Sequence, residues 1–220
     1  MWSVDIELIA KWLASLDDDS QAQVVAAIEL LQEHGPRLGR PLVDTVTASR
    51  HKNMKELRPG SSGRSELRVL FAFDPKRQGI LLVAGDKARE LEELVQEEHP
   101  GGRRPVRRPP GHVERRVIEM AMSLKDFLAE HPVDRERVEA NKERMLSEVR
   151  AYRLRELRES AGLTQEQLAQ RIGVGQRQVS KIEHGDLDNA KIGTIRSYLE
   201  AVGGDLAIEY VTGDARIQVA

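Results

Sequence analysis

The stretch that decides the fold runs from Leu163 to Gly185 and reads LTQEQLAQRIGVGQRQVSKIEHG. Thr164 and Gln167 have the spacing of a capping box, in which both side chains satisfy free backbone amides at a helix start. Apolar residues follow at helical spacing. Gly173 predicts the end of that helix, because glycine enters the left-handed conformation without strain. We therefore predict a short helix between Thr164 and Gly173.

A second helix is predicted from about Gly175, with Val179 and Ile182 facing inward. The pattern resembles the helix-turn-helix of phage-repressor-type DNA-binding proteins, although that family more often has a serine or threonine cap at Gly175. Glutamine and arginine make bidentate contacts to base edges in the major groove. The candidate DNA-binding residues are the outward polar ones: Thr164, Gln165, Gln176, Arg177, Gln178, Ser180 and Lys181. The alternative is a small helical bundle with a polar face.

The composition sets limits on the class of protein. The chain has 220 residues, enough for two small domains, and a formal net charge of -2. It has no cysteine, which excludes disulfides and thiolate metal sites, and we expect no metal and no cofactor. It has no signal-peptide pattern and no apolar run that would span a bilayer, so we expect a cytoplasmic protein without a membrane partner.

The first half predicts an α+β domain with two N-terminal helices and then an antiparallel sheet. Apolar residues recur at helical spacing over residues 6–16, and a second amphipathic helix is predicted from about Asp19 to His34. Residues 67–73 alternate as a strand, residues 74–79 read as a turn, and residues 80–84 predict a buried strand. The second half predicts an all-α helix-turn-helix domain that ends in a strand, over residues 205–211.

The junction, residues 90–119, has the composition of a linker. It holds five glutamates between Glu90 and Glu98, and then six arginines and four prolines between Pro100 and Ile118. A forward shift of the reading frame by one nucleotide, with GC-rich codons, converts residues 90–117 into an aromatic-rich peptide followed by a stop. We interpret this linker as derived from a frameshift that fused two overlapping genes. The alternative is an unusual natural linker.

Residues 1–89 resemble the HigB branch of the RelE-like toxins, which are ribosome-dependent mRNA interferases. The resemblance lies in residues 38–42, 54–58, 64–75 and 81–87. It implies mRNA on the ribosome as a partner. Cleavage of RNA by its own 2′-hydroxyl needs a proton acceptor, a proton donor and cations on the phosphoryl oxygens. The candidate catalytic residues are Lys55, Arg58, Arg64, Arg68 and Lys87.

Other assignments for these groups stay open. His34 and His51 are further candidates for acid–base chemistry, although His34 fits a helix C-terminus equally well. The cations could also do no more than solvate one face of the sheet, with Arg68 paired to Glu56 or Glu66. In that case the first half serves only as an interaction or corepressor surface of a DNA-binding regulator.

Residues 120–220 resemble the cognate HigA antitoxin, so the chain reads as a fused type II toxin–antitoxin protein. Residues 148–220 are expected to bind operator DNA as a homodimer, with the terminal strand at the dimer interface. Residues 120–147 are expected to contact the toxin half, in cis or in trans. We expect Glu139, Glu143 and Glu148 to lie on the basic residues 50–89, which hold ten Lys/Arg against four Asp/Glu. The alternative is that this helix packs only on its own helix-turn-helix.

Overall fold

The computed structural model describes residues 2–47, 49, 53–60, 66–75, 77–86, 121–187, 189–212 and 215–218. The chain divides into two compact units, Met1–Leu146 and Ser147–Ala220. The division falls inside the long helix α6, Arg135–Ser160. No helix in the described ranges is long and apolar enough to cross a membrane. The interpretation of residues 90–119 as a frameshift product falls outside the described residues.

Unit 1 begins with a short strand and then two helices. The 3-10 turn η1, Glu7–Ile9, leads into α1, Ala10–Ala14. The longer helix α2, Asp18–His34, begins where the Asp17 side chain accepts a hydrogen bond from the Ser20 amide at 2.9 Å. It ends at Gly35, followed by the 3-10 turn η2, Gly35–Arg37. The predicted helix from Asp19 to His34 is therefore confirmed.

The sheet of unit 1 has five strands in the order β1-β5-β4-β3-β2. Their bounds are β1 Ser3–Asp5, β2 Val43–Thr45, β3 Met54–Leu57, β4 Leu67–Phe73 and β5 Gln78–Asp86. Strands β2 to β5 are antiparallel, and the predicted fold class is confirmed. The sheet is nevertheless mixed, because β1 pairs parallel with β5 at the edge. A three-residue strand that pairs some 75 positions away carries no local periodicity from which to predict it.

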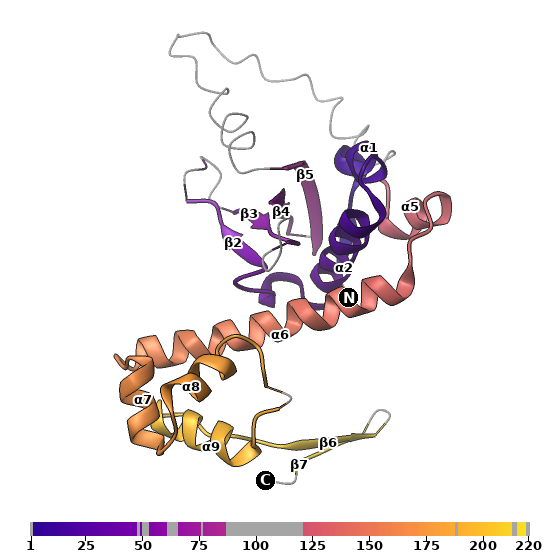
Figure 1. Ribbon diagram of the computed structural model, residues 1–220. Coiled ribbons are helices and arrows are strands. Elements are labelled where there is room, and N and C mark those ends of the chain that lie inside the picture. Colours follow the sequence, from indigo (N-terminus) through magenta and orange to yellow (C-terminus); the bar gives the residue numbers. More distant parts are fainter. Residues whose placement is uncertain are drawn as a thin grey trace, which may run out of the picture. The chain divides into compact units, whose positions relative to one another are not determined.

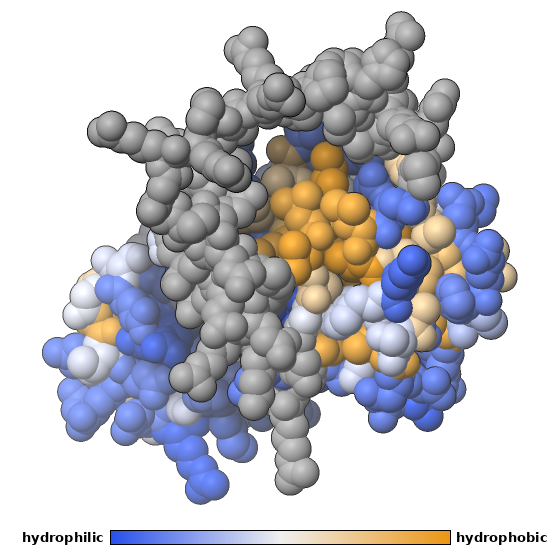
Figure 2. All heavy atoms as spheres, turned by 90° about the horizontal axis from the view of Figure 1, so that it is seen from above, coloured by the Kyte–Doolittle hydropathy of each residue, from blue (hydrophilic) through white to orange (hydrophobic). Residues whose placement is uncertain are grey.

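Helix α2 is buried on almost every side. Five consecutive residues, Val24–Ile28, are fully buried, and at about 100° per residue they cover the whole circumference of a helix. One side packs on the sheet, where Leu57, Val69 and Phe71 are also fully buried. In Figure 1, α2 lies between the sheet and the segment of α5 and α6. On the face drawn in Figure 2, apolar residues gather in one area, and most of the other coloured residues are hydrophilic.

Residues 121–146 complete unit 1. Helix α5, Leu124–Glu130, begins where the Ser123 hydroxyl accepts a hydrogen bond from the Asp126 amide, and it buries Leu124 and Phe127. The Ile6 amide donates to the Met122 carbonyl at 3.0 Å, and Asp5 forms an isolated antiparallel bridge with Ser123. This segment of the second half of the sequence therefore belongs to the fold of the first half.

Unit 2 is a small helical bundle followed by a hairpin. It contains the end of α6, then α7 Gln165–Ile172, α8 Gln176–Ile182 and α9 Ile192–Ala201. Its core consists of Leu168, Ala169, Val179, Ile182 and Tyr198. Strands β6, Glu209–Thr212, and β7, Ala215–Gln218, pair antiparallel with each other. The predicted terminal strand exists, but it begins at Glu209 rather than at residue 205.

Candidate nucleic-acid interfaces

The predicted helix-turn-helix forms in unit 2 with the expected local chemistry. Thr164 accepts a hydrogen bond from the Gln167 amide at 3.1 Å, and the Gln167 side chain accepts one from the Thr164 amide at 2.8 Å. The capping box is therefore confirmed. Gly173 ends α7 with φ +70° and ψ +33°, in the left-handed region. Val174, in the turn, packs against the core of the unit.

Helix α8 presents part of the predicted DNA-binding set to solvent. Gln176, Arg177 and Lys181 are exposed, whereas Val179 and Ile182 on the opposite side are buried. The side chains of Arg177 and Lys181 make no hydrogen bond or ion pair with any residue that the structure describes. Two cations and an amide are thus available to an outside ligand along one exposed side of a short helix.

The other members of the set have partners or are half-buried. Thr164 is exposed, and its hydroxyl is engaged in the capping box. The Gln165 amide nitrogen donates to Glu183 at 2.9 Å. Gln178 is half-buried, and the Ser180 hydroxyl lies 3.4 Å from Nδ1 of the exposed His184. The seven residues therefore lie on or next to two consecutive helices. Those whose side chains are both exposed and without a partner among the described residues are on α8.

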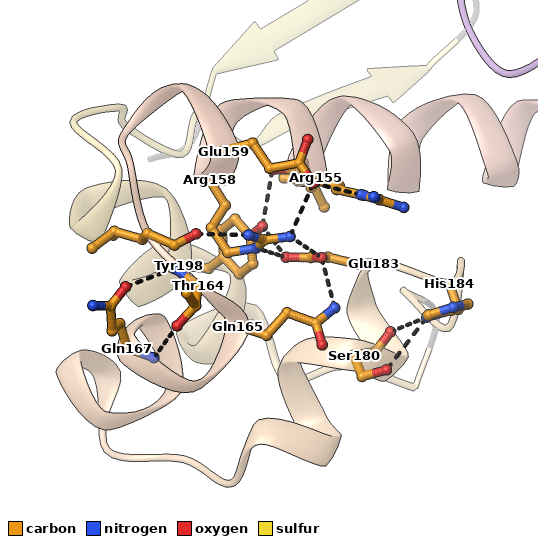
Figure 3. A network of polar contacts seen from close by, with 12 residues as sticks. Arg155, Arg158, Glu159, Thr164, Gln165, Gln167, Ser180, Glu183, His184 and Tyr198 are labelled. Atoms are coloured by element: carbon orange, nitrogen blue, oxygen red, sulfur yellow. Dashed lines mark hydrogen bonds and ion pairs between the residues drawn. The ribbon is translucent and has the colours of Figure 1, made fainter.

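A buried polar network ties α6, α7, α8 and α9 together (Figure 3). Arg158 donates through Nε to Oε1 of Glu183 at 2.6 Å and through Nη2 to Oε2 at 2.9 Å. The Tyr198 hydroxyl donates to Glu183 at 2.7 Å and to the Leu154 carbonyl at 2.9 Å. The sequence did not predict this network, because the partners of these bonds lie 15 to 44 residues apart.

The network shifts the ionisation of its members. Burial on its own favours the neutral form of Glu183, but the hydrogen bonds from Arg158, Gln165 and Tyr198 outweigh burial and hold the pKa of this carboxyl below its usual value. Burial, followed by the bond to Glu183, raises the pKa of the Tyr198 hydroxyl well above its usual value. Glu183 therefore stays ionised, and Tyr198 stays protonated, at neutral pH.

The two strands of the terminal hairpin are exposed. All eight residues of β6 and β7 are exposed, among them the apolar side chains of Tyr210, Val211 and Ile217. An isolated two-stranded hairpin in water is marginally stable at best. The hairpin therefore offers both unpaired strand edges and apolar side chains to a partner.

The predicted catalytic cations of unit 1 are held on the sheet by carboxylates. Arg58 pairs with Glu56 at 2.6 Å and with Asp44 at 3.2 Å, and Arg68 pairs with the other oxygen of Glu56 at 3.4 Å. Asp44 lies opposite Glu56 in the register of β2 and β3. Arg58 follows Glu56 by two positions, and Arg68 is two positions from the residue of β4 that lies opposite Glu56. Because side chains alternate between the two faces of a sheet, all four residues share one face. The alternative in which Arg68 pairs with Glu56 is confirmed.

The remaining candidates of unit 1 are dispersed. Lys55 donates to the Thr45 hydroxyl at 2.7 Å and lies one position from Glu56, so it belongs to the opposite face. The structure therefore brings Arg58 and Arg68 together but not Lys55. Arg64, Lys87 and His51 lie outside the described residues. His34 is in the last turn of α2, where its Nε2 is buried and has no hydrogen-bond partner among the described residues.

The expected contact of α6 with residues 50–89 through glutamates is wrong for Glu139. Glu139 pairs within its own helix, with Arg135 at 3.1 Å and with Lys142 at 3.6 Å. The basic residues of α6 instead reach α2: Arg135 pairs with Glu29 at 2.7 Å, and Lys142 pairs with Glu33 at 2.7 Å. The count of charged residues over 50–89 did not predict these pairs, because Arg58 and Arg68 already have Asp44 and Glu56 as partners.

Two families match this chain. The family described as Phage derived protein Gp49-like (DUF891) matches residues 11–100, and the family described as Helix-turn-helix matches residues 154–208. Three relatives come from Mycobacterium tuberculosis (strain ATCC 25618 / H37Rv). The chain is 66% identical to "Putative toxin HigB2" over 87 residues, which are 40% of this chain and 43% of that protein. It thus spans less than half the length of this relative.

The other two relatives are matched over most or all of their length. The chain is 52% identical to "Putative toxin HigB3" over 80 residues, 36% of this chain and 68% of that protein. It is 48% identical to "Putative antitoxin HigA2" over 101 residues, which are 46% of this chain and 100% of that protein. A solved structure titled "DNA bound antitoxin HigA3" is 37% identical, with a TM-score of 0.27, and the match covers 30% of this chain and 87% of that one.

Proposed function

The chain belongs to the HigB–HigA family of toxin–antitoxin proteins, with a HigB-like half before a HigA-like half, and from this premise we propose that its second half binds operator DNA and represses its own operon. The observation that carries this proposal is the exposed side of α8, where Gln176, Arg177 and Lys181 lie opposite the buried Val179 and Ile182. Arginine and glutamine read base edges in the major groove, and lysine neutralises phosphates.

A dimer is part of the proposal. One such module with ten Lys/Arg against eleven Asp/Glu over residues 148–220 has little general attraction to DNA, so two modules on a palindrome are needed for firm binding. The exposed hairpin of β6 and β7 supports a dimer, because its strand edges and its apolar residues Tyr210, Val211 and Ile217 need a cover.

For the first half, we propose a ribosome-dependent mRNA endonuclease of the RelE-like class. Arg58 and Arg68 lie on one sheet face, where two guanidinium groups could bind a phosphoryl oxygen and stabilise the charge of the transition state. Arg64 and Lys87 complete the proposed set of cations, whereas Lys55 lies on the opposite face of the sheet and is not part of it. Residues 120–147 cover this half and neutralise it, in cis or in trans.

The second candidate function is a DNA-binding regulator whose first half is catalytically inert. One observation favours it: Arg58 and Arg68 are already paired with Asp44 and Glu56, which lowers the positive charge that this face presents to RNA. Measuring mRNA integrity after induction of a toxin in which the shifted reading frame is restored separates the two candidates, because an endonuclease should cleave mRNA in that form and an inert interaction surface should not.

The DNA-binding proposal is tested by fluorescence anisotropy with the full chain and a labelled fragment of its own promoter region, at two salt concentrations. Arg177→Ala is expected to weaken specific binding by about 1–3 kcal/mol and to relax specificity at one base position. Lys125→Ala, an exposed cation of unit 1, is the matched control and should bind as the parent chain does. Unchanged operator affinity and specificity of Arg177→Ala would show that α8 is not the recognition helix.

A further inference from the structure

We propose that the outer side of α2 is a recognition surface that selects its covering helix by charge. Its carboxylates, Asp19, Glu29 and Glu33, accept a helix with basic residues in register and reject one with acidic residues there. The occupant is the segment 121–146 of this chain, which pairs with α2 in the structure. This inference rests on the proposed toxin–antitoxin function, and it identifies the charge pattern that the contact between the two halves recognises.

The sequence of α2 requires a cover on the side away from the sheet. Residues Val24–Ile28 are all fully buried, as are Leu30 and Leu31. A helix that is apolar all round is stable only when other elements pack on all its sides. The small side chains of Ala22 and Ala26 allow a second helix to approach closely. The outer side of α2 is thus built for a helix and not for water.

The covering helix carries basic and apolar residues on the same side. Arg135, Val138, Lys142 and Met145 are spaced by three, four and three residues, which places them in one stripe along α6. Val138 and Met145 are fully buried. Arg135 and Lys142 pair with carboxylates of α2. The stripe therefore combines buried apolar side chains with basic side chains that pair with the carboxylates of α2.

Most of the ion pairs form one connected cluster with Glu29 and Lys142 at its centre. Arg135 donates to both oxygens of Glu29, at 2.7 and 3.1 Å, and this bidentate geometry fixes direction as well as distance. Lys142 reaches Glu33 at 2.7 Å, Glu29 at 3.4 Å and Glu139 at 3.6 Å. Arg137 pairs with Asp19 near the start of α2. Five members of this group, Glu29, Glu33, Arg135, Glu139 and Lys142, are here called the charge cluster.

The two central charges are mostly withdrawn from water. The side chains of Lys142 and Glu29 are 14% and 16% exposed. Burial favours the neutral form of Glu29, but its bonds to Arg135 and Lys142 outweigh burial and lower the pKa of this carboxyl. Burial likewise opposes the charged form of Lys142, and the three glutamates outweigh it and raise the pKa of the ammonium group. Both groups therefore stay charged under the covering helix.

Because they are partly buried, these ion pairs discriminate between covering helices of different charge. An exposed ion pair contributes little, because water solvates both charges when they separate. A half-buried carboxylate that faces an apolar or acidic helix loses its hydration without gaining a partner. The resulting penalty acts against wrong helices, which is how charged groups produce specificity between related partners. Glu29 is the residue on which this discrimination depends most.

The test inverts the charge cluster in the full chain. One variant changes only α2, E29K/E33K, and a second changes only α6, R135E/E139K/K142E. A third carries all five substitutions and so retains every attractive pair with its sign reversed. Lys125→Glu is the matched control, because Lys125 is an exposed cation of the same segment and has no partner among the described residues. The readout is hydrogen exchange of the amides of residues 135–146.

The two variants in which only α2 or only α6 is changed are called the one-sided variants. Their amides over residues 135–146 should exchange at least about tenfold faster than those of the parent chain. The five-fold variant and Lys125→Glu should exchange at nearly the parent rate. Parent-like protection in both one-sided variants, or no recovery in the five-fold variant, overturns the inference.

A binding measurement keeps the test decisive if the five-fold variant does not fold. Labelled synthetic peptides of residues 121–147, one with the parent sequence and one with R135E/E139K/K142E, are titrated with each one-sided variant. The chain with the parent α2 should bind the parent peptide at least about tenfold more tightly, and the E29K/E33K chain should prefer the inverted peptide. Equal affinities contradict charge selection. Neither readout involves RNA cleavage or DNA binding, so a failed proposed function would not be mistaken for a failure of this inference.

Discussion

Arg158 and Glu183 form a two-point ion pair inside unit 2, with side chains that are 7% and 1% exposed. The pair joins α6 to the residue that directly follows α8, and Tyr198 and Gln165 bind the same carboxylate. The position of the proposed recognition helix thus depends on a contact between α6 and the end of α8.

Glu183→Gln should destabilise unit 2 strongly. The substitution leaves the buried Arg158 guanidinium with only the half-exposed Glu159, at 3.6 Å, as a counter-charge, and the loss of one member of a buried pair costs about 3–5 kcal/mol. Urea unfolding followed by circular dichroism measures the change. Arg155→Ala is the control, since its pair with Glu159 on the same helix is half exposed and should contribute less than about 1 kcal/mol. Equal effects of the two variants would mean that the buried pair contributes no more to the free energy of unfolding than the half-exposed pair.

The stability of unit 2 should depend on pH in the acid range. The pKa of Glu183 is lower in the folded chain than its usual 4.5. Its stabilising contribution is therefore complete above the unfolded value and is lost as the pH falls below about 4.5 and through the folded value. Unfolding curves between pH 7 and pH 2 measure this slope. Glu183→Gln should flatten the slope, and an unchanged slope in that variant would assign the acid sensitivity to other carboxyls.

Two glycines of the helix-turn-helix should respond in opposite directions. Gly173→Ala should destabilise unit 2 by about 1–2 kcal/mol, because φ is +70° there. Gly175 has extended backbone at the N-cap of α8 and no side-chain cap, so Gly175→Ser should stabilise the helix by roughly a few tenths of a kcal/mol. An added Cβ meets nothing within 4 Å at either position, so packing does not confuse the comparison. Thermal unfolding of both variants measures it.

Gly35→Ala should destabilise unit 1 by about 2 kcal/mol or more. Gly35 has φ +54°, and an added Cβ would lie 2.2 Å from the Trp2 indole nitrogen. Trp2 in turn stacks edge-on against Phe73, with ring centroids 5.0 Å apart. Gly39→Ala is the matched control, because nothing lies within 4 Å of its added Cβ. Similar unfolding midpoints for the two variants would contradict this account of the Trp2 contact.

The full chain should cleave mRNA poorly or not at all. The glutamates of residues 90–98 repel RNA, and a tethered antitoxin segment acts at an effective concentration in the mM range when its linker spans the gap. A toxin in which the shifted reading frame is restored should arrest growth, and Arg68→Ala or Lys87→Ala should relieve the arrest. Translation and mRNA integrity after induction are the measurements. Equal cleavage by the full chain and the frame-restored toxin would contradict both arguments.

The sequence was sufficient for features whose causes are local. The capping box of Thr164 and Gln167, the left-handed Gly173 and the buried side of α8 all follow from residues within a few positions of one another. The strand β1, the network around Glu183 and the contact of α6 with α2 were not predicted. In each of these the partners are far apart in the sequence, and many other partners have the same charge or polarity.

The burial of α2 on all sides also sets an order of events during synthesis. About 100 residues separate the end of α2 from the start of α6. At roughly 5–20 residues per second, the ribosome needs about 5–20 s to make that length. During this interval the apolar outer side of α2 has been made, and the helix that covers it has not. The nascent chain must therefore keep this surface from aggregating, on its own or with a chaperone, until residues 135–146 emerge.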